Sequence, residues 1–205
     1  MLLVIGSKCK SSWSLRPWLL LKQFQIPFEE KLIALDQMQT TSEILQFSPS
    51  ARVPVLIDAN NTIWDSLAIA EYLNEKYPSH QMWPADQSLR ARARSISNEM
   101  HSGFVNMRNH MPHDLAKKTA NFDWSFARSD IERVIQIWTE CLKFSKGPFL
   151  FGTFSIADAM YAPVVNRFVT YGIPLDEICQ NYVQHMRSLP SHQLWIKEAL
   201  KESSS

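Results

Sequence analysis

Apolar and polar residues follow two different repeats along the chain, and the repeat changes near residue 80. Residues 2–5 form a short apolar run that ends in Gly6, which predicts a buried strand. The apolar cluster over 17–24 predicts a helix of about three turns, with Pro17 in its first turn. A second strand is predicted over 28–35. Because a strand, a helix and a strand follow one another, we expect a right-handed crossover.

A helix, a hairpin and a further helix complete this first part. They are predicted over residues 41–47, 53–64 and 65–77. Asn60 and Asn61 are typical of the tight turn inside such a hairpin. The resulting order, βαβαββα, predicts an α/β unit with a mixed sheet flanked by helices.

The second part has helical spacing almost throughout. Helices are predicted over 88–108, 130–146, 155–171, 175–186 and 193–200. We therefore predict an α/β domain over residues 1–77, a linker over 78–87 and an all-helical domain over 88–205.

Composition and charge exclude several classes of function. The chain has 21 Lys and Arg against 20 Asp and Glu, so no net field favours nucleic acid or an anionic membrane. No apolar run approaches the roughly 18 residues of a membrane helix. The three cysteines and six histidines show no metal-ligand spacing, so we expect no metal. A cytoplasmic protein with a small-molecule partner is predicted.

Three short motifs carry candidate chemistry. Ser11 and Ser12 precede the first helix, where free N–H groups and serine hydroxyls favour an anion, although a serine there can also act only as an N-cap. Pro54 opens a strand, and a cis Val53-Pro54 bond would leave the Val53 backbone free to pair with a peptide-like ligand. Asp65-Ser66 begins another helix and suits a group with a carboxylate and an ammonium.

In this order, the motifs resemble the glutathione transferase superfamily over nearly the whole chain. The resemblance implies a thioredoxin-like N-terminal domain and an all-helical C-terminal domain, the latter marked by a capping box at Ser155 and Asp158. The stretch from Ser11 to Arg16 resembles the serine-type, zeta-like class. Trp13 replaces the cysteine of that class, which puts isomerase activity in doubt.

The resemblance implies roles for individual residues. Ser11 or Ser12 would stabilise the thiolate of glutathione, the co-substrate. Val53 and Pro54 would hold its cysteinyl unit, Asp65 and Ser66 its γ-glutamyl end, and Arg52 or Gln37 its glycyl carboxylate. Trp13 would contact glutathione and also form the wall for a small apolar electrophile. The rest of that wall is predicted from residues spaced by three or four on helix 88–108, although ordinary packing explains the same pattern: His101, Phe104, Met107, Arg108 and Met111.

The predicted function is that of a homodimeric glutathione S-transferase with a role in detoxification. One alternative is a non-catalytic binding module with the same fold. Another is a glutathione-dependent thiol oxidoreductase or isomerase, in which Cys9 would be reactive because Lys8 and Lys10 lower the pKa of an exposed thiol.

Overall fold

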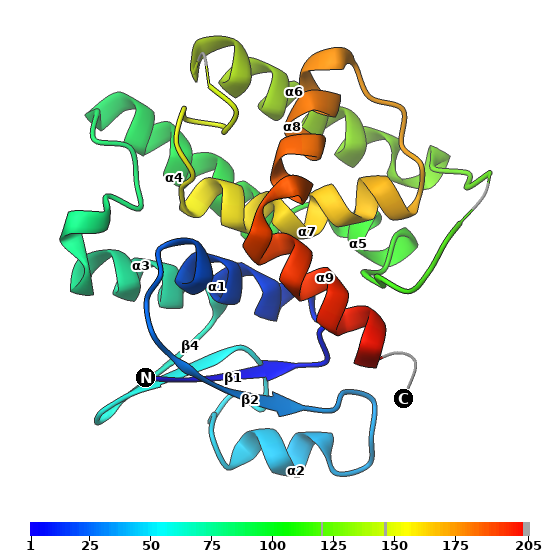
Figure 1. Ribbon diagram of the computed structural model, residues 1–205. Coiled ribbons are helices and arrows are strands. Elements are labelled where there is room, and N and C mark those ends of the chain that lie inside the picture. Colours follow the sequence, from blue (N-terminus) through cyan, green and yellow to red (C-terminus); the bar gives the residue numbers. More distant parts are fainter. Residues whose placement is uncertain (120, 146, 203–205) are drawn as a thin grey trace.

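The computed structural model describes residues 1–119, 121–145 and 147–202. The predicted helix end at Lys146 and the last residues of the second predicted domain, 203–205, lie outside the described residues. The chain folds into a sheet with flanking helices, followed by a region of packed helices (Figure 1).

The first part forms the predicted βαβαββα order. Its elements are β1 (Leu2–Gly6), α1 (Ser12–Gln23), β2 (Glu29–Ile33), α2 (Thr40–Leu45), β3 (Val55–Asp58), β4 (Asn61–Trp64) and α3 (Ser66–Lys76). The strands lie in the order β2-β1-β3-β4, with β1 parallel to β2 and the other pairs antiparallel. The register pairs Val4 with Val55, and the hairpin pairs Asp58 with Asn61. The turn therefore lies at Ala59 and Asn60, one residue earlier than predicted.

Strand β1 serves two hydrophobic cores because successive side chains alternate between the sheet faces. Leu3 and Ile5 join the main core, which includes α1, α3 and the helical region. Val4 faces the other way and packs with Ile44 of α2. Accordingly, α1 and α3 lie between the sheet and the helical region, whereas α2 covers the opposite face (Figure 1).

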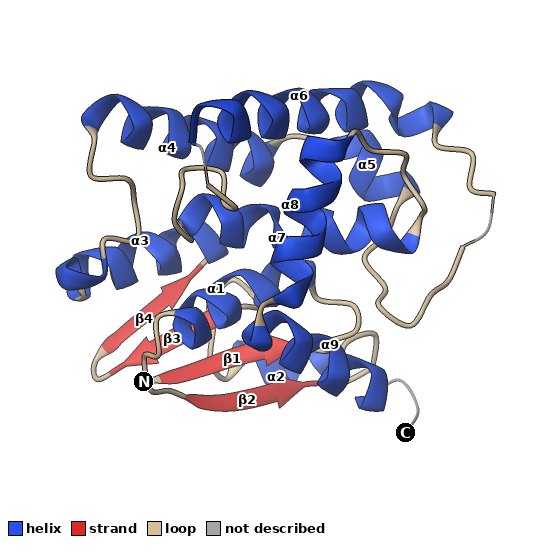
Figure 2. Ribbon diagram, turned by 45° about the horizontal axis from the view of Figure 1, so that its top comes forward, coloured by secondary structure: helices blue, strands red, loops and turns tan. Residues whose placement is uncertain are grey.

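Apart from an isolated β-bridge between Phe151 and Thr153, the regular elements described in the second part are helices. This part contains α4 (Gln87–Ser102), α5 (Val105–His110), α6 (Arg128–Ser145), α7 (Ile156–Thr170), α8 (Glu177–Ser188) and α9 (Pro190–Glu202), with the short 3-10 turns η1 (Pro78–His80) and η2 (Ser125–Ala127). Helix α7 packs against both α1 and α4 and so joins the sheet region to the helices. Helix α9 returns to pack on α1, beside the sheet (Figure 2).

The predicted single helix over 88–108 is wrong, because α4 ends at Ser102 and Gly103 is its C-cap. A Cβ on Gly103 would meet the Glu99 carbonyl oxygen at 2.7 Å, so only glycine fits this backbone. Phe104 then adopts the left-handed conformation, with φ of 60°, and starts α5 in a new direction. The Arg108 guanidinium stabilises the break by donating to the carbonyl oxygens of Gly103 and Met100.

The first helix begins earlier than predicted, at Ser12 instead of Pro17. Ser11 caps it, because its hydroxyl oxygen accepts a hydrogen bond from Ser14 N over 3.3 Å. Pro17 consequently lies in the second turn, where it leaves one backbone carbonyl without its helical donor. The longer helix brings Ser12 and Trp13 into its first turn.

Candidate functional site

The loop before β3, the junction of β4 with α3 and the first turn of α1 meet around a pocket of about 240 Å³. Helix α4 closes it with His101 near its last turn. The lining residues are Trp13, Ser50, Arg52, Val53, Pro54, Trp64, Asp65, Ser66 and His101. Of these, the sequence did not predict Ser50 and Trp64; Trp64 directly precedes Asp65, and Ser50 lies two residues before Arg52.

The Val53-Pro54 peptide bond is cis, as the motif allowed. Pro54 is buried, whereas Val53 is partly exposed at the edge of the pocket. Arg52, one residue earlier, is exposed and also lines the pocket. This loop therefore brings a backbone segment and a positive charge to the same wall.

The start of α3 supplies the opposite wall. Asp65 caps the helix, because its Oδ1 accepts from Leu67 N over 2.8 Å and from Ala68 N over 3.2 Å. Its φ of 78° is rare for a non-glycine residue, and such backbone strain concentrates at functional sites. Ser66 follows as the first residue of α3 and is 1% exposed. A helix N-terminus with a serine hydroxyl is suited to bind a carboxylate.

His101 links the helical region to this wall. Its Nε2 lies 3.0 Å from Asp65 Oδ2, and its ring makes an edge contact with Trp13 at 5.3 Å between centroids. Burial lowers the pKa of His101 below its ordinary value, and the charge of Asp65 opposes that shift. Near neutral pH, His101 is therefore a neutral group beside the carboxylate.

Two arginines lie over the Trp13 indole. The guanidinium carbon of Arg16 is 4.3 Å from the ring centroid, and that of Arg108 is 4.8 Å away. Such cation–π contacts stabilise both partners. Arg16 is a further candidate, to which the sequence analysis gave no role beyond its place in the zeta-like stretch from Ser11 to Arg16. Its signal was its place one turn after Ser12, on the same helix face.

The hydroxyl groups of the two serines at the start of α1 differ in their hydrogen bonds. Both are 5% exposed. The Ser11 hydroxyl donates to Ser14 Oγ over 2.8 Å and accepts from Ser14 N, so the cap occupies it. Within the described part of the chain, the Ser12 hydroxyl has no hydrogen-bond partner. Neither serine is a lining residue of the pocket, whereas the adjacent Trp13 is.

Besides the two serines and Arg108, four more predicted residues do not line the pocket. Gln37 is exposed, and its side chain amide donates to the Leu35 carbonyl. Phe104, Met107 and Met111 belong to the hydrophobic core, with exposures of 7%, 0% and 0%. The break at Gly103 turns them away from the face of His101, so the prediction of one shared helix face is wrong.

Cys9 is buried and does not have the environment of a reactive thiol. It is 6% exposed, and its Sγ lies 3.3 Å from Asp114 Oδ1, to which it donates. Burial raises the pKa of Cys9 above its ordinary value, and the neighbouring Asp114 adds to the rise. Lys10 pairs with Asp36 and Lys8 with two glutamates, so both lysines are neutralised.

We expect Cys9 in the folded protein to resist alkylation by iodoacetamide at neutral pH. The thiolate is the reactive species, and both burial and a raised pKa reduce its amount. Mass spectrometry of a timed alkylation, with a urea-unfolded sample as the control, measures the modification of each cysteine. Modification of Cys9 in the folded protein at the rate of the unfolded sample would contradict this reading.

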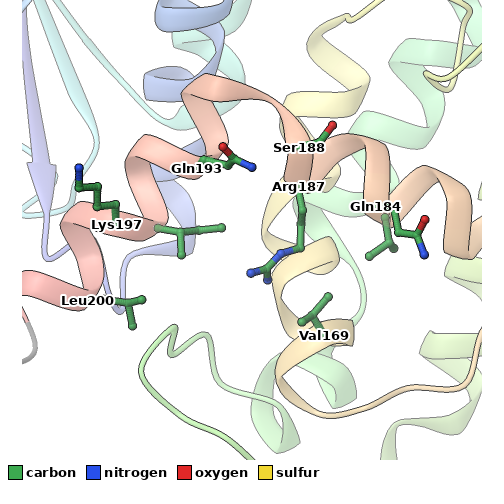
Figure 3. A pocket seen from close by; sticks show the side chains of 9 residues that line it. Val169, Gln184, Arg187, Ser188, Gln193, Lys197 and Leu200 are labelled. Carbon is green, nitrogen blue, oxygen red and sulfur yellow. The ribbon is translucent and has the colours of Figure 1, made fainter.

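A larger groove lies elsewhere, between α8 and α9, with a volume of about 740 Å³. Arg187 and Lys197 are among its lining side chains, and the groove contains none of the predicted site residues (Figure 3). In the described residues, no three His, Cys, Asp or Glu side chains are grouped so as to hold a metal ion. Nor does any described helix have the length and apolar character to cross a membrane.

Comparison with known proteins gives matches over both parts of the chain. The family model of the glutathione S-transferase N-terminal domain matches residues 10–76, and that of the C-terminal domain matches residues 87–187. A probable maleylacetoacetate isomerase from Caenorhabditis elegans is 33% identical over 162 residues, which cover 77% of this chain and 75% of that protein. A zeta-class glutathione S-transferase from Euphorbia esula is 39% identical over 71 residues, 35% of this chain and 32% of that protein.

A solved structure agrees with these relatives. It is that of a glutathione transferase homologue from Burkholderia strain BGR1 with bound glutathione. That structure has a TM-score of 0.76 and 27% sequence identity, and the match covers 98% of each chain. The thioredoxin-like sheet domain and the helical region are therefore those of cytosolic glutathione transferases. With its motifs, its fold and these matches in agreement, the chain belongs to the glutathione S-transferase family.

Proposed function

We propose that this protein binds glutathione in the pocket between the cis-proline loop and α3, and transfers the thiolate to a small, apolar electrophile. The observation that carries the proposal is the convergence of Val53, Pro54, Asp65 and Ser66 on one pocket beside the start of α1. A backbone edge, a helix N-terminus and a serine hydroxyl together suit a peptide with a free carboxylate.

Each wall of the pocket has a proposed role. The Val53 backbone pairs with the cysteinyl unit of glutathione, and Pro54 sets the geometry of that loop. Asp65 and Ser66 take the γ-glutamyl end, and the exposed Arg52 takes the glycyl carboxylate. Gln37 lies outside the pocket lining and has no part in the proposal.

A serine at the start of α1 acts as a hydrogen-bond donor and not as a nucleophile. A cysteine thiol has a pKa of about 8.5, so little of it is ionised at neutral pH. A hydroxyl donor and the N-terminus of α1 stabilise the thiolate, which then attacks the electrophile. Ser12 is the better candidate, because its hydroxyl has no partner in the described structure whereas the Ser11 hydroxyl is used by the cap.

We expect Ser12→Ala to raise the pKa of the bound glutathione thiol by about one unit. At neutral pH, this change lowers the fraction of ionised thiol by about tenfold. Ser11→Ala should instead lower the free energy of unfolding by about 1 kcal/mol, through loss of the helix cap. Ultraviolet absorbance of the thiolate across pH, with binding measured by calorimetry, gives the first value, and urea unfolding gives the second. If Ser11→Ala alone raised the thiol pKa, the roles of the two serines would be reversed.

The wall for the electrophile is proposed from Trp13, Trp64, His101 and Arg108. The first three line the pocket, and Arg108 lies over the Trp13 ring. The aromatic side chains favour a planar substrate. Phe104, Met107 and Met111 support this wall from the core without reaching the pocket.

A second candidate function is glutathione-dependent isomerisation. The similarity to the probable maleylacetoacetate isomerase favours this function. The presence of Trp13 in place of the zeta-class cysteine argues against isomerase activity. Assays of conjugation and of isomerisation on the same preparation decide between the two. Binding of glutathione without ionisation of its thiol would favour a non-catalytic module. Homodimeric assembly, a cytoplasmic location and a role in detoxification stay predictions.

A further inference from the structure

Arg16 lies directly behind the wall of the pocket. The residue is 1% exposed, and its Nη1 donates to Ser66 Oγ over 3.3 Å. Its guanidinium also stacks over Trp13. Both Ser66 and Trp13 line the pocket, although Arg16 itself does not. Any influence of Arg16 on a ligand therefore passes through these two side chains or through its charge.

The positive charge of Arg16 is poorly compensated. Within the described residues, its Nε and Nη2 are buried without hydrogen-bond partners. Burial, together with repulsion from Arg108 and Arg167, holds the pKa of Arg16 well below its usual range. Asp65 is the nearby acid. Its carboxylate, however, already accepts hydrogen bonds from the first turn of α3 and contacts His101. A buried cation without a dedicated partner is costly, so a folding role alone does not account for it.

The contact with Arg16 determines what the Ser66 hydroxyl can do. Because Ser66 Oγ accepts from Arg16, its own proton remains available to donate. The backbone N–H of Ser66 also has no acceptor among the described residues, since Asp65 Oδ1 takes those of Leu67 and Ala68 instead. Two free donors of one residue, at a helix N-terminus backed by a buried cation, form a carboxylate site.

We infer that Arg16 is a positioning residue that orients the Ser66 hydroxyl toward the α-carboxylate of the γ-glutamyl unit of glutathione. This inference rests on the proposed function. The bound carboxylate supplies the negative charge that Arg16 lacks in the free protein. Arg16 thus lowers the stability of the free protein and increases its selectivity for a peptide with this carboxylate.

The test compares two ligands that differ only in that group. The first is glutathione, and the second is γ-aminobutyryl-cysteinyl-glycine, which keeps the amine and lacks the α-carboxylate. Calorimetry should show that the wild type prefers glutathione by about tenfold or more. Arg16→Met should weaken glutathione binding by about tenfold and leave the affinity for the analogue unchanged. Arg16→Lys, which keeps the charge without the planar fork, should restore part of the preference.

Stability provides a second readout that a purely structural role would not produce. Arg16→Met removes an uncompensated buried charge and keeps an apolar side chain, so the thermal midpoint of the free protein should not fall. Added glutathione should raise the midpoint of the wild type more than that of the variant. Arg187→Met, in the groove of Figure 3, is the matched control that removes an arginine far from the site and should change neither affinity.

The Ser66→Ala background shows whether Arg16 acts through the hydroxyl. There the effect of Arg16→Met on glutathione binding should shrink, because the group through which Arg16 acts is gone. If Arg16→Met does not fold, Ser66→Ala by itself should abolish the preference for glutathione. Equal weakening of both ligands, or a lowered midpoint with an unchanged preference, would overturn the inference. If the wild type binds both ligands equally, only this inference fails, whereas if it binds neither, the proposed function fails.

Discussion

Replacing Asp158 with alanine is expected to lower the free energy of unfolding by about 3–5 kcal/mol. Asp158 is fully buried in the first turn of α7. Its Oδ2 accepts from the Ser155 backbone N–H and hydroxyl, each over 2.9 Å. Its Oδ1 accepts from Leu150 N over 3.0 Å and from the Tyr182 hydroxyl over 3.2 Å. Alanine would leave these donors buried without an acceptor, in the helix that joins both parts of the protein.

Urea unfolding followed by circular dichroism measures this loss. Asp158→Asn is the matched control, because it keeps the shape and one acceptor oxygen, and it should lose less stability than the alanine variant. Ser155→Ala removes the other half of the capping box and should cost about 1 kcal/mol. A cost for Asp158→Ala no greater than that for Ser155→Ala would contradict the central role given to this carboxylate.

Because the same carboxyl group is buried, we expect the stability of the protein to depend on pH. Burial raises the pKa of Asp158 to about 6, although its hydrogen bonds oppose the shift. In the unfolded chain the pKa is about 3.9. Between these values the folded state binds more protons than the unfolded state, so the contribution of this group to stability falls as pH rises from about 4 to about 6. Unfolding measured across this window should show that decline in the wild type and not in Asp158→Asn.

Replacing Lys8 with methionine is expected to cost about 2–3 kcal/mol of stability. Lys8 lies between β1 and α1, is 6% exposed, and has its Nζ 2.6 Å from carboxylates of both Glu30 and Glu198. The indoles of Trp18 and Trp195 lie beside the ammonium group, at 5.3 Å and 5.6 Å. Methionine keeps the packing and removes the charge. The two glutamates remain partly hydrated, so the cost is below that of a fully buried pair.

The loss should also loosen α9, because Glu198 and Trp195 lie on that helix. Hydrogen exchange should therefore rise in α9 more than in α6, and urea unfolding gives the total cost. Lys10→Met is the matched control. Lys10 pairs with Asp36 over 3.0 Å at an exposed site, where an ion pair contributes little. Equal effects of the two substitutions would show that the buried pairs of Lys8 contribute no more than a surface contact.

Local patterns predicted the fold well. The alternation in β1, the turn residues before β4 and the proline at residue 54 are features of neighbouring residues, and the order βαβαββα followed from them. The capping box at Ser155 and Asp158 was also predicted and is present, because its partners are three residues apart. Even the break of the long helix had a sequence signal in Gly103, a residue typical of helix ends.

The candidate site was predicted where its residues belong to short motifs. Val53, Pro54, Asp65 and Ser66 reach one pocket because the hairpin between them returns the chain to the same edge of the sheet. The predicted wall on helix 88–108 was wrong in part, because its assumed periodicity continued through Gly103. An apolar residue at helical spacing can face a pocket or the core, and only the packing of α5 against α6 and η2 placed Met107 in the core.

By itself, the sequence determined the order of the elements in the sheet region, the capping box at Ser155 and Asp158, and the family to which the chain belongs. These features depend on residues within a few positions of one another, where backbone geometry allows few alternatives. Only the tertiary structure decided that Cys9 is buried against Asp114, that His101 contacts Asp65, and that Arg16 supports Ser66 from behind the pocket. These contacts join residues far apart in the chain, so their burial and charge balance depend on how the sheet and helices pack together.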